Sequence, residues 1–174
     1  MILARGRLFL QDPADARHGS TSPNAQATIT FMENPSKPSA SIVRRGVVAV
    51  VMRNDRFLVI RRAAGVLAPG KYCFPGGGIE ANECEADALV REFREELGVP
   101  LRPVRCIWRS TTRWHVALAW WLGELDEAAE LSPNPAEVES FHWLTSREML
   151  AAAELLDSNR QFLDALAART IQLG

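Results

Sequence analysis

The stretch FPGGGIEANECEADALVREFREELGV, from Phe74 to Val99, places a glycine triplet before a run crowded with glutamate. A helix over residues 84–97, at about 100° per residue, gathers its apolar side chains in one sector. The neighbouring sector carries the acidic side chains of Glu85, Glu92, Glu95 and Glu96. Like charges one turn apart cost about 0.2–0.5 kcal/mol per pair. Either water solvates these carboxylates as an ordinary polar face, or a positive ion lies among them.

The residue types in this stretch suit a hard divalent cation. Such a cation prefers oxygen ligands, and Mg²⁺ is typically held by carboxylates together with substrate phosphates and water. Carboxylates bind these ions without any cysteine or histidine, and no Cys/His cluster stands near this helix. The glycines before the helix can turn tightly and expose backbone groups to a ligand. The sequence therefore offers a metal site and a solvated acidic face as alternatives.

The chain of 174 residues divides into a tail and one domain. Residues 1–41 are rich in Pro, Ser, Asn and Ala without periodicity, so they are expected to be a disordered N-terminal tail. Residues 42–174 alternate apolar, β-branched runs with helical patterns, which indicates one α/β or α+β domain. The expected strands are 46–52, 57–62, 104–110, 115–125 and 138–144; the expected helices are 84–97, 146–150 and 159–169.

The net charge, the apolar runs and the number of cysteines limit which partners and which cellular compartment are expected. A net charge of −1 gives no electrostatic argument for a nucleic acid or a membrane surface, so neither partner is expected. No apolar run reaches the length of roughly 20 residues that a membrane helix needs. The three cysteines do not indicate a disulfide framework, and a reduced cytoplasmic location is expected.

The spacing within the opening stretch matches a known signature. Gly77, five residues, Glu83, seven residues and then REFREELGV, residues 91–99, resembles the Nudix hydrolase motif G-x5-E-x7-R-E-U-x-E-E-x-G-U, where U is a bulky apolar residue. The resemblance extends from Gly46 to about Ala168. It implies an α/β/α sandwich with a mixed β-sheet. It also implies hydrolysis of a nucleoside diphosphate linked to another moiety, with Mg²⁺, or Mn²⁺ in its place.

The resemblance also implies roles for the residues of the motif. Glu92, Glu95 and Glu96 would be the metal ligands, helped by the backbone of Gly77. The expected pairing of Arg91 with Glu83 would hold the loop against the helix.

A carboxylate that is not tightly coordinated can accept a proton from water. The resemblance offers Glu92 for this role, or Glu137 in the loop downstream. Glu137 also falls where one branch of the family has a further metal-site glutamate.

That branch is the MutT-like one, the nucleoside triphosphate pyrophosphohydrolases. The segment IRRAAGVLAPGKYCFPGGGIE, residues 60–80, and the segment LLDSNRQFLDAL, residues 155–166, resemble it. By this resemblance Arg62 would meet the nucleotide, Phe74 would pack on the base and Asn159 would read the base edge. The plainer alternatives are a surface ion pair for Arg62, a core position for Phe74 and a helix N-cap for Asn159.

Departures from the branch pattern leave the substrate open. Gly78 stands where the branch often has lysine, and Trp114 stands where it has arginine. The expected activity is release of pyrophosphate and a nucleoside monophosphate from a triphosphate. The alternatives are hydrolysis of another diphosphate, such as a nucleotide sugar or dinucleotide, and a non-catalytic sensor module. A homodimer is a possible assembly.

Overall fold

The structure is a computed structural model that describes residues 44–174, so the expected tail lies outside the described residues. Most of the predicted elements are present with shifted ends. The strands are β1 (Arg44–Arg53), β2 (Arg56–Arg62), β3 (Tyr72–Cys73), β4 (Gly76–Gly78), β5 (Arg102–Thr111), β6 (Val116–Glu124) and β7 (Val138–Leu144). The helices are α1 (Glu85–Leu97), α2 (Ser146–Ala151) and α3 (Asp157–Ala167).

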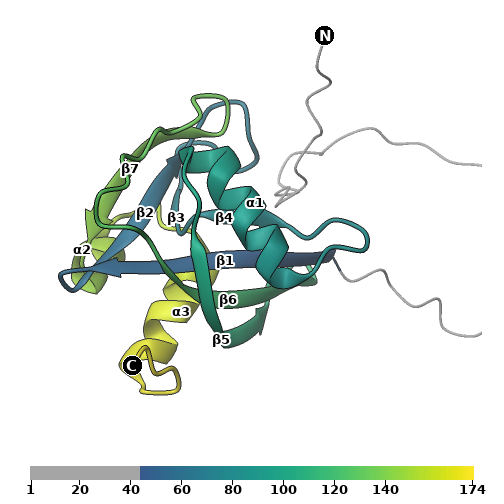
Figure 1. The fold of residues 1–174 in the computed structure, drawn as a ribbon. Helices are drawn as coiled ribbons and strands as arrows, with labels where there is room; N and C mark the ends of the chain where they lie inside the picture. Colours follow the sequence, from purple (N-terminus) through teal and green to yellow (C-terminus); the bar gives the residue numbers. More distant parts are fainter. Residues whose placement is uncertain (1–43) are drawn as a thin grey trace, which may run out of the picture. The chain divides into compact units, whose positions relative to one another are not determined.

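The strands of the described region join in one mixed sheet, which confirms the predicted fold class. Its main path runs β3-β2-β1-β6-β5, with β4 beside β1 and β7 beside β2 (Figure 1). β1 and β6 are parallel, and the other strand pairs are antiparallel. A parallel pair needs a crossover connection. Here that connection contains β2, β3, β4, α1 and β5.

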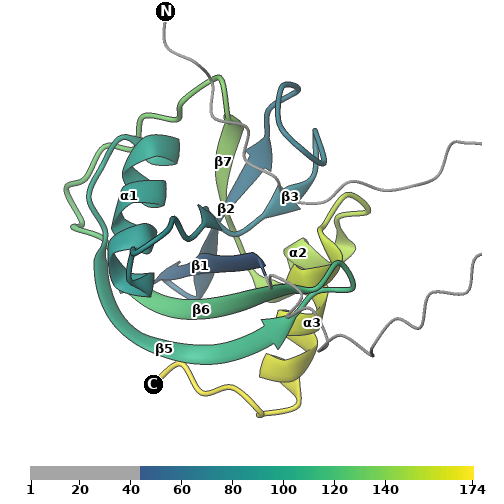
Figure 2. The ribbon, with the colours of Figure 1, turned by 90° about the vertical axis from the view of Figure 1, so that its right-hand side faces the viewer.

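β1 is buried on both faces, and its side chains alternate between two cores. Val47, Ala49 and Val51 pack in the cluster that contains Leu89 and Phe93 of α1. Val48 and Val50 point to the opposite face, in a cluster that includes residues of α3. Figure 2 shows α1 on one side of β1 and β6, and α3 on the other. This alternation produces the helix–sheet–helix layers.

The opening stretch forms α1 because its apolar residues repeat at helical spacing and its ends are capped. Leu89, Phe93 and Leu97 are fully buried, and each such side chain contributes about 1.5–3 kcal/mol by leaving water. Cys84 is the N-cap, and Gly98 ends the helix at a left-handed φ of 76°. Glycine adopts that conformation without the strain a side chain would bring.

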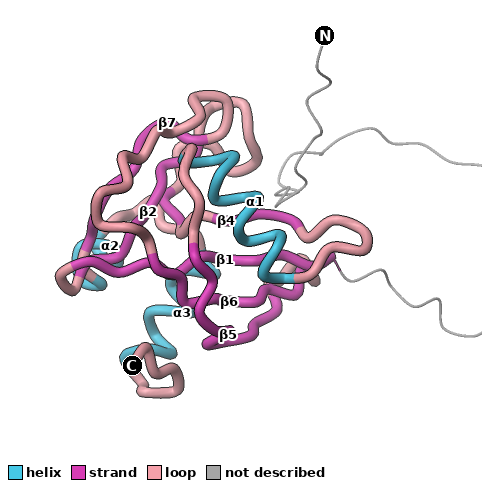
Figure 3. Tube along the Cα trace, viewed as in Figure 1, coloured by secondary structure: helices cyan, strands magenta, loops and turns pink. Residues whose placement is uncertain are grey.

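Two short strands were not predicted. The glycine triplet, for which no strand was predicted, is β4, and it pairs with β1 through Gly46, Val47 and Val48. β1 pairs with β2 only near the hairpin, at Met52 and Arg53. Figure 3 shows β4 leading through a loop into α1. β1 therefore changes partner along its length.

The C-terminal helix also differs from its prediction. α3 begins at Asp157, and its N-cap is Leu156, so the N-cap alternative for Asn159 is wrong. In residues 44–174, no helix is long and apolar enough to cross a bilayer.

Candidate active site

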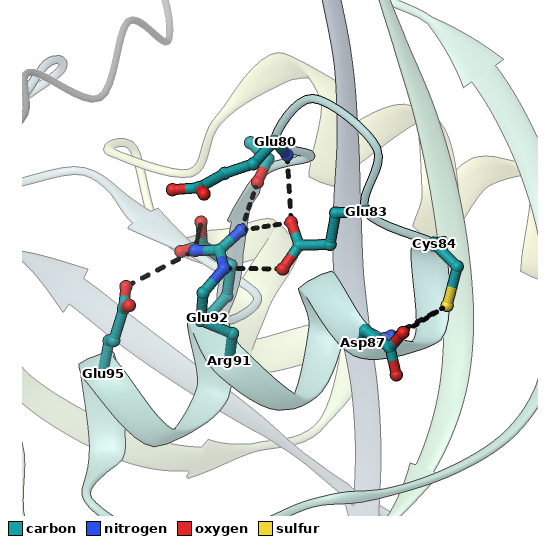
Figure 4. A network of polar contacts seen from close by, with 8 residues as sticks. Glu80, Glu83, Cys84, Asp87, Arg91, Glu92 and Glu95 are labelled. Atoms are coloured by element: carbon teal, nitrogen blue, oxygen red, sulfur yellow. Dashed lines mark hydrogen bonds and ion pairs between the residues drawn. The ribbon is translucent and has the colours of Figure 1, made fainter.

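Four carboxylates, those of Glu83, Glu92, Glu95 and Glu96, form an acidic cluster on α1 and the loop before it. Arg91 lies within this cluster and joins α1 to that loop (Figure 4). Its Nε and one terminal nitrogen donate to the two Glu83 carboxylate oxygens, each at 2.7 Å. The same terminal nitrogen donates to the Gly78 carbonyl at 2.9 Å. The predicted Glu83–Arg91 pair is therefore present, and it is bidentate. Such a pair fixes geometry as well as charge.

Glu92 is buried against the glycine strand. Its side chain is about 2% exposed, and its Oε1 accepts from Arg91 at 2.8 Å. An ideal Cβ on Gly77 would lie 2.3 Å from Glu92 Oε2. Only glycine at position 77 lets this carboxylate lie so close to the backbone of β4.

Glu96, one turn further along α1, is also buried, with 3% exposure. Its Oε2 accepts a hydrogen bond from the Gly76 backbone N–H at 2.8 Å. Gly76 has a φ of 142°, which suits glycine. Two carboxylates of α1 are thus held against adjacent residues of one strand.

Glu95 differs from its neighbours because its side chain is 44% exposed. It accepts from Arg91 at 3.5 Å. Glu85, the fourth acidic residue of the predicted sector, turns instead to Arg109, which donates to it at 2.8 and 3.0 Å. Glu85 therefore lies apart from the carboxylates that surround Arg91.

The donor chemistry fits a hard divalent cation. Carboxylates of Glu92, Glu95 and Glu96 and the backbone of Gly77 are oxygen donors, and burying two carboxylates is costly unless a cation compensates them. As they stand within residues 44–174, no three acidic, histidine or cysteine side chains are grouped so that they could hold a metal ion. Glu95 is the most exposed of the three carboxylates.

Replacing Gly77 by alanine is expected to displace the Glu92 carboxylate. The added methyl would overlap a buried group that is hydrogen-bonded to Arg91, so we expect a loss of about 1–3 kcal/mol of stability. Metal affinity should fall about 10–100-fold, as happens when a group that orients ligands is lost. Chemical denaturation and Mn²⁺ titration would measure the two effects. Gly65→Ala is the control, since its nearest neighbour would lie at 3.9 Å.

The Glu83–Arg91 pair predicts a pH dependence of stability. Hydrogen bonding from Arg91 lowers the pKa of Glu83 below its ordinary value of 4.5. A lowered folded-state pKa adds stability that is present above 4.5 and is lost as pH falls through the folded-state pKa. Urea unfolding of wild type and Glu83→Gln should therefore differ most near neutral pH and converge in acid. A stability difference that is constant with pH would contradict the assignment, and Glu130→Gln serves as an exposed control.

A cleft opens beside this cluster, where the pairing partner of β1 changes from β2 to β4. Its volume is about 730 Å³, including the part open to solvent. Six of the sequence-predicted residues line it: Arg62, Phe74, Gly77, Glu96, Glu137 and Asn159. The predicted residues Glu83, Arg91, Glu92 and Glu95 are not in the cleft wall; they lie behind or beside it on α1 and the preceding loop.

Arg62 supplies the positive charge of the cleft wall. Its Nε donates to the Leu67 carbonyl at 2.7 Å, which holds the β2–β3 loop against the strand. A terminal nitrogen lies 3.9 Å from the Cys73 sulfur. Within residues 44–174 the Arg62 side chain thus contacts a carbonyl and a thiol rather than a carboxylate, which does not support the surface-pair alternative.

Phe74 and Asn159 meet at the floor of the cleft. Phe74 is 3% exposed and makes edge contacts with Phe57, Trp120 and Phe162. Asn159, also 3% exposed, accepts from the Phe74 backbone N–H at 2.8 Å through Oδ1. Phe74 thus occupies a core position that also borders the cleft, and stacking on a base stays a prediction.

Glu137 enters the cleft wall from the segment before β7. Its carbonyl accepts from the Ala63 N–H at 3.0 Å, directly after β2. The β2–β7 register slips between Arg61 and Arg62, which leaves Glu139 as the extra residue. Bulges of this kind redirect side chains near active sites. This one lies where Arg62 and Glu137 approach the cleft.

Sequence reasoning missed several residues of the cleft wall: Val47, Val48, Val66, Leu67, Cys73, Thr112, Leu118, Leu156 and Ser158. Burial raises the pKa of the Cys73 thiol to about 11, so this group stays neutral and protonated at physiological pH. The position of Cys73 immediately before Phe74 was an available signal. The others come from separate strands and loops, and only the fold brings them together.

The NUDIX domain family model matches residues 43–166, which include the whole acidic cluster and every residue that lines the cleft. The chain belongs to the Nudix hydrolase family. The human m7GpppN-mRNA hydrolase NUDT17 is 28% identical to this Nudix chain over 186 residues, covering 89% of the chain and 57% of that protein. The NAD-capped RNA hydrolase NudC of Stutzerimonas stutzeri is 28% identical, over 72% of the chain and 45% of that protein.

The CTP pyrophosphohydrolase of Escherichia coli is 42% identical over 53 residues, 30% of the chain and 39% of that protein. This Nudix chain spans about half the length of the curated relatives that it matches. The MutT protein structure from Methanosarcina mazei superposes with a TM-score of 0.63 at 19% identity, over 73% of the chain and 94% of that structure. This agreement supports the fold.

Proposed function

We propose that this Nudix domain hydrolyses a nucleoside triphosphate, giving a nucleoside monophosphate and pyrophosphate, with Mg²⁺ as its cation. The observation that carries the proposal is the shared cleft: Glu96 and Glu137 line it together with Arg62 and Asn159. Acidic oxygen donors and a guanidinium in one cleft suit a metal-bound polyphosphate joined to a nucleoside.

Glu92, Glu95 and Glu96, with the Gly77 backbone, would hold the cation. When bound, a divalent cation neutralises phosphate charge and increases the acidity of water. Side chains of the protein bind the substrate and position the carboxylates. Arg62 binds a phosphate oxygen, and Arg91 keeps the carboxylates in place through its bonds to Glu83 and Glu92.

The proton acceptor must reach water in the cleft. Glu137 lines the cleft, whereas Glu92 is buried against Gly77 and bonded to Arg91. We therefore favour Glu137 over Glu92 for this role. Replacement by glutamine should lower the rate constant of the chemical step more than it lowers substrate affinity.

Asn159 has a donor available for a base. Its Oδ1 is engaged by Phe74, and its Nδ2 donates to Ser158 Oγ at 3.2 Å, so the amide N–H₂ retains a second hydrogen. Asn159→Ala should remove that donor and leave the buried Phe74 N–H without its acceptor. We expect a loss of about 1–3 kcal/mol in stability and a higher KM. Steady-state kinetics and thermal unfolding would measure both, with the exposed Gln161→Ala as the control.

A second candidate substrate is a nucleotide-capped or triphosphorylated RNA 5′ end. It is favoured by the names of relatives, which include an m7GpppN-mRNA hydrolase, an NAD-capped RNA hydrolase and an RNA pyrophosphohydrolase. The sensor alternative is not favoured, because the acidic cluster and the cleft are both intact. The three cysteines are free thiols, which suits the proposed cytoplasmic location. A homodimer stays a prediction.

A substrate panel tests the proposal. It contains the common dNTPs, 8-oxo-dGTP, ADP-ribose, a nucleotide sugar, a dinucleoside tetraphosphate and a capped oligonucleotide, with products separated by ion-exchange chromatography. Pyrophosphate and monophosphate from triphosphates would support the first candidate and name the base. Cleavage of the capped RNA alone would support the second. A folded, Mg²⁺-loaded protein that cleaves no member of the panel would contradict both.

A further inference from the structure

The cleft passes through the sheet, and its ends lie on opposite faces of it. Cys73, the last residue of β3, packs in the core cluster on the α1 face, whereas the next residue, Phe74, packs in the cluster on the α3 face. Val47 and Val48 of β1 alternate between the same two clusters. Figure 2 shows α1 and α3 on these two sides. All four residues line the cleft, so it reaches from the α1 face to the α3 face.

The end of the cleft on the α3 face combines an apolar wall with a buried amide. Phe74, Val48 and Leu118 all belong to the cluster on this face, and each of them borders the cleft. Asn159 accepts from the Phe74 N–H at 2.8 Å, which fixes its amide at the same end. The proposed function places the nucleoside base here.

The charged groups of the cleft lie on the α1 face. Glu96 extends from α1 itself and accepts from the Gly76 N–H at 2.8 Å. Arg62 follows Ile60 by two positions on β2, and Ile60 packs in the cluster on the α1 face. Because side chains alternate along a strand, both point to that face. A terminal nitrogen of Arg62 also lies 3.9 Å from the sulfur of Cys73. The polyphosphate of a bound substrate is therefore expected on the α1 face.

A second apolar wall borders these charged groups. Val66 and Leu67, in the loop between β2 and β3, line the cleft and are only partly buried. Arg62 Nε donates to the Leu67 carbonyl at 2.7 Å, which holds the loop beside the guanidinium. The guanidinium thus contacts the loop through Nε and Cys73 through a terminal nitrogen. Apolar side chains therefore flank the phosphate site on the side of the loop as well as on the side of Phe74.

A nucleoside triphosphate has no group that suits the wall formed by Val66 and Leu67. Beyond the scissile bond it carries only charged phosphates, which gain nothing beside apolar side chains. A flat ring at that position would instead bury apolar surface, at about 25 cal/mol per Å². Contacts with a part of the substrate away from the reacting atoms can raise kcat/KM. Two apolar walls on either side of a phosphate site therefore fit a polyphosphate that carries a ring at each end.

We propose that Val66 and Leu67 form a second base site, and that the preferred substrate carries a nucleoside at each end of its polyphosphate. The inference rests on the proposed hydrolysis of a nucleoside polyphosphate and narrows its substrate class. Water adds to one phosphorus atom, an anhydride P–O bond breaks and water's proton passes to the acceptor carboxylate; the products are a nucleoside monophosphate and a nucleoside that keeps the remaining phosphates. A dinucleoside polyphosphate and the 5′ cap of an RNA share this chemistry, and a free cap dinucleotide compared with a capped ten-nucleotide RNA distinguishes them.

The test compares substrates that differ only in the second nucleoside, each with Mg²⁺: diadenosine tetraphosphate with adenosine 5′-tetraphosphate, and diguanosine tetraphosphate with guanosine 5′-tetraphosphate. Wild type should have a kcat/KM about tenfold or more higher for the dinucleoside member of a pair. Val66→Ser/Leu67→Ser should lower that ratio about tenfold, a change of about 1.4 kcal/mol that about 55 Å² of apolar contact supplies. The matched control is Ala64→Ser, at an exposed position of the same loop outside the cleft wall, which should keep the wild-type ratio.

Binding of methylene-bridged analogues of the same pairs, measured by calorimetry, gives a readout separate from turnover. Equal affinity and equal kcat/KM within each pair would overturn the inference, and continued hydrolysis would leave the proposed function standing. A wild-type ratio in the double variant would also overturn it, because Val66 and Leu67 would then not contact the second nucleoside. Tighter binding of the dinucleoside analogues without hydrolysis of any substrate would support the second base site and contradict the proposed function.

Discussion

Replacing Glu96 by glutamine is expected to lower kcat by about 10²–10³-fold, the loss typical when a preorganised charge-stabilising group is removed. Glu96 joins the acidic cluster to the cleft: it is buried on α1, lines the cleft and accepts from the Gly76 N–H. Glutamine keeps an oxygen for that hydrogen bond and keeps the shape of the side chain. It removes the negative charge that a cation needs.

The fold should therefore survive this change, and stopped-flow or steady-state kinetics would measure the loss of turnover beside an unchanged circular dichroism spectrum. Glu127→Gln, in an exposed turn, is the matched control and should leave kcat unaltered. Wild-type turnover and wild-type metal dependence in Glu96→Gln would show that Glu96 is not a metal ligand.

Replacing Arg91 by alanine is expected to cost about 3–5 kcal/mol of unfolding free energy, the range for removal of one partner from a buried ion pair. Arg91 holds Glu83, Glu92 and the Gly78 carbonyl together. Without it, the buried Glu92 carboxylate lies beside a backbone strand with its main counter-charge removed. A loss of this size is a large part of the 5–15 kcal/mol that stabilises a typical domain.

Urea unfolding would measure the effect, with Arg94→Ala as the control on the exposed face of the same helix. Arg91→Lys should recover only part of the stability, because lysine cannot make the bidentate contact with Glu83. If Arg91→Ala unfolds at the same urea concentration as Arg94→Ala, the central role given to Arg91 is wrong.

The elements with strong side-chain periodicity were predictable from sequence. The β7 prediction matches its observed ends, and α1 begins one residue later than expected. β3 and β4 were missed for a physical reason. Glycine has no side chain, so GGG at 76–78 carries no alternation, and its strand character comes only from backbone pairing with β1.

The acidic cluster was predictable because its members lie close together in sequence, so helical geometry alone relates them. The cleft, in contrast, is formed by residues that lie far apart in sequence. Arg62 and Glu137 meet through the β2–β7 bulge, and Asn159 reaches Phe74 across 85 positions of sequence. The resemblance to a known family proposed these residues, whereas periodicity could not.

We expect hydrolysis of a nucleoside polyphosphate to require a divalent cation held by the acidic cluster. The most direct test follows product release from the best substrate of the panel with Mg²⁺, after addition of EDTA, and after excess Mg²⁺ is restored. Turnover by the wild type should stop with EDTA and return with Mg²⁺, and turnover by Glu96→Gln should stay at least about 100-fold lower throughout. Turnover that continues unchanged in EDTA would contradict this expectation.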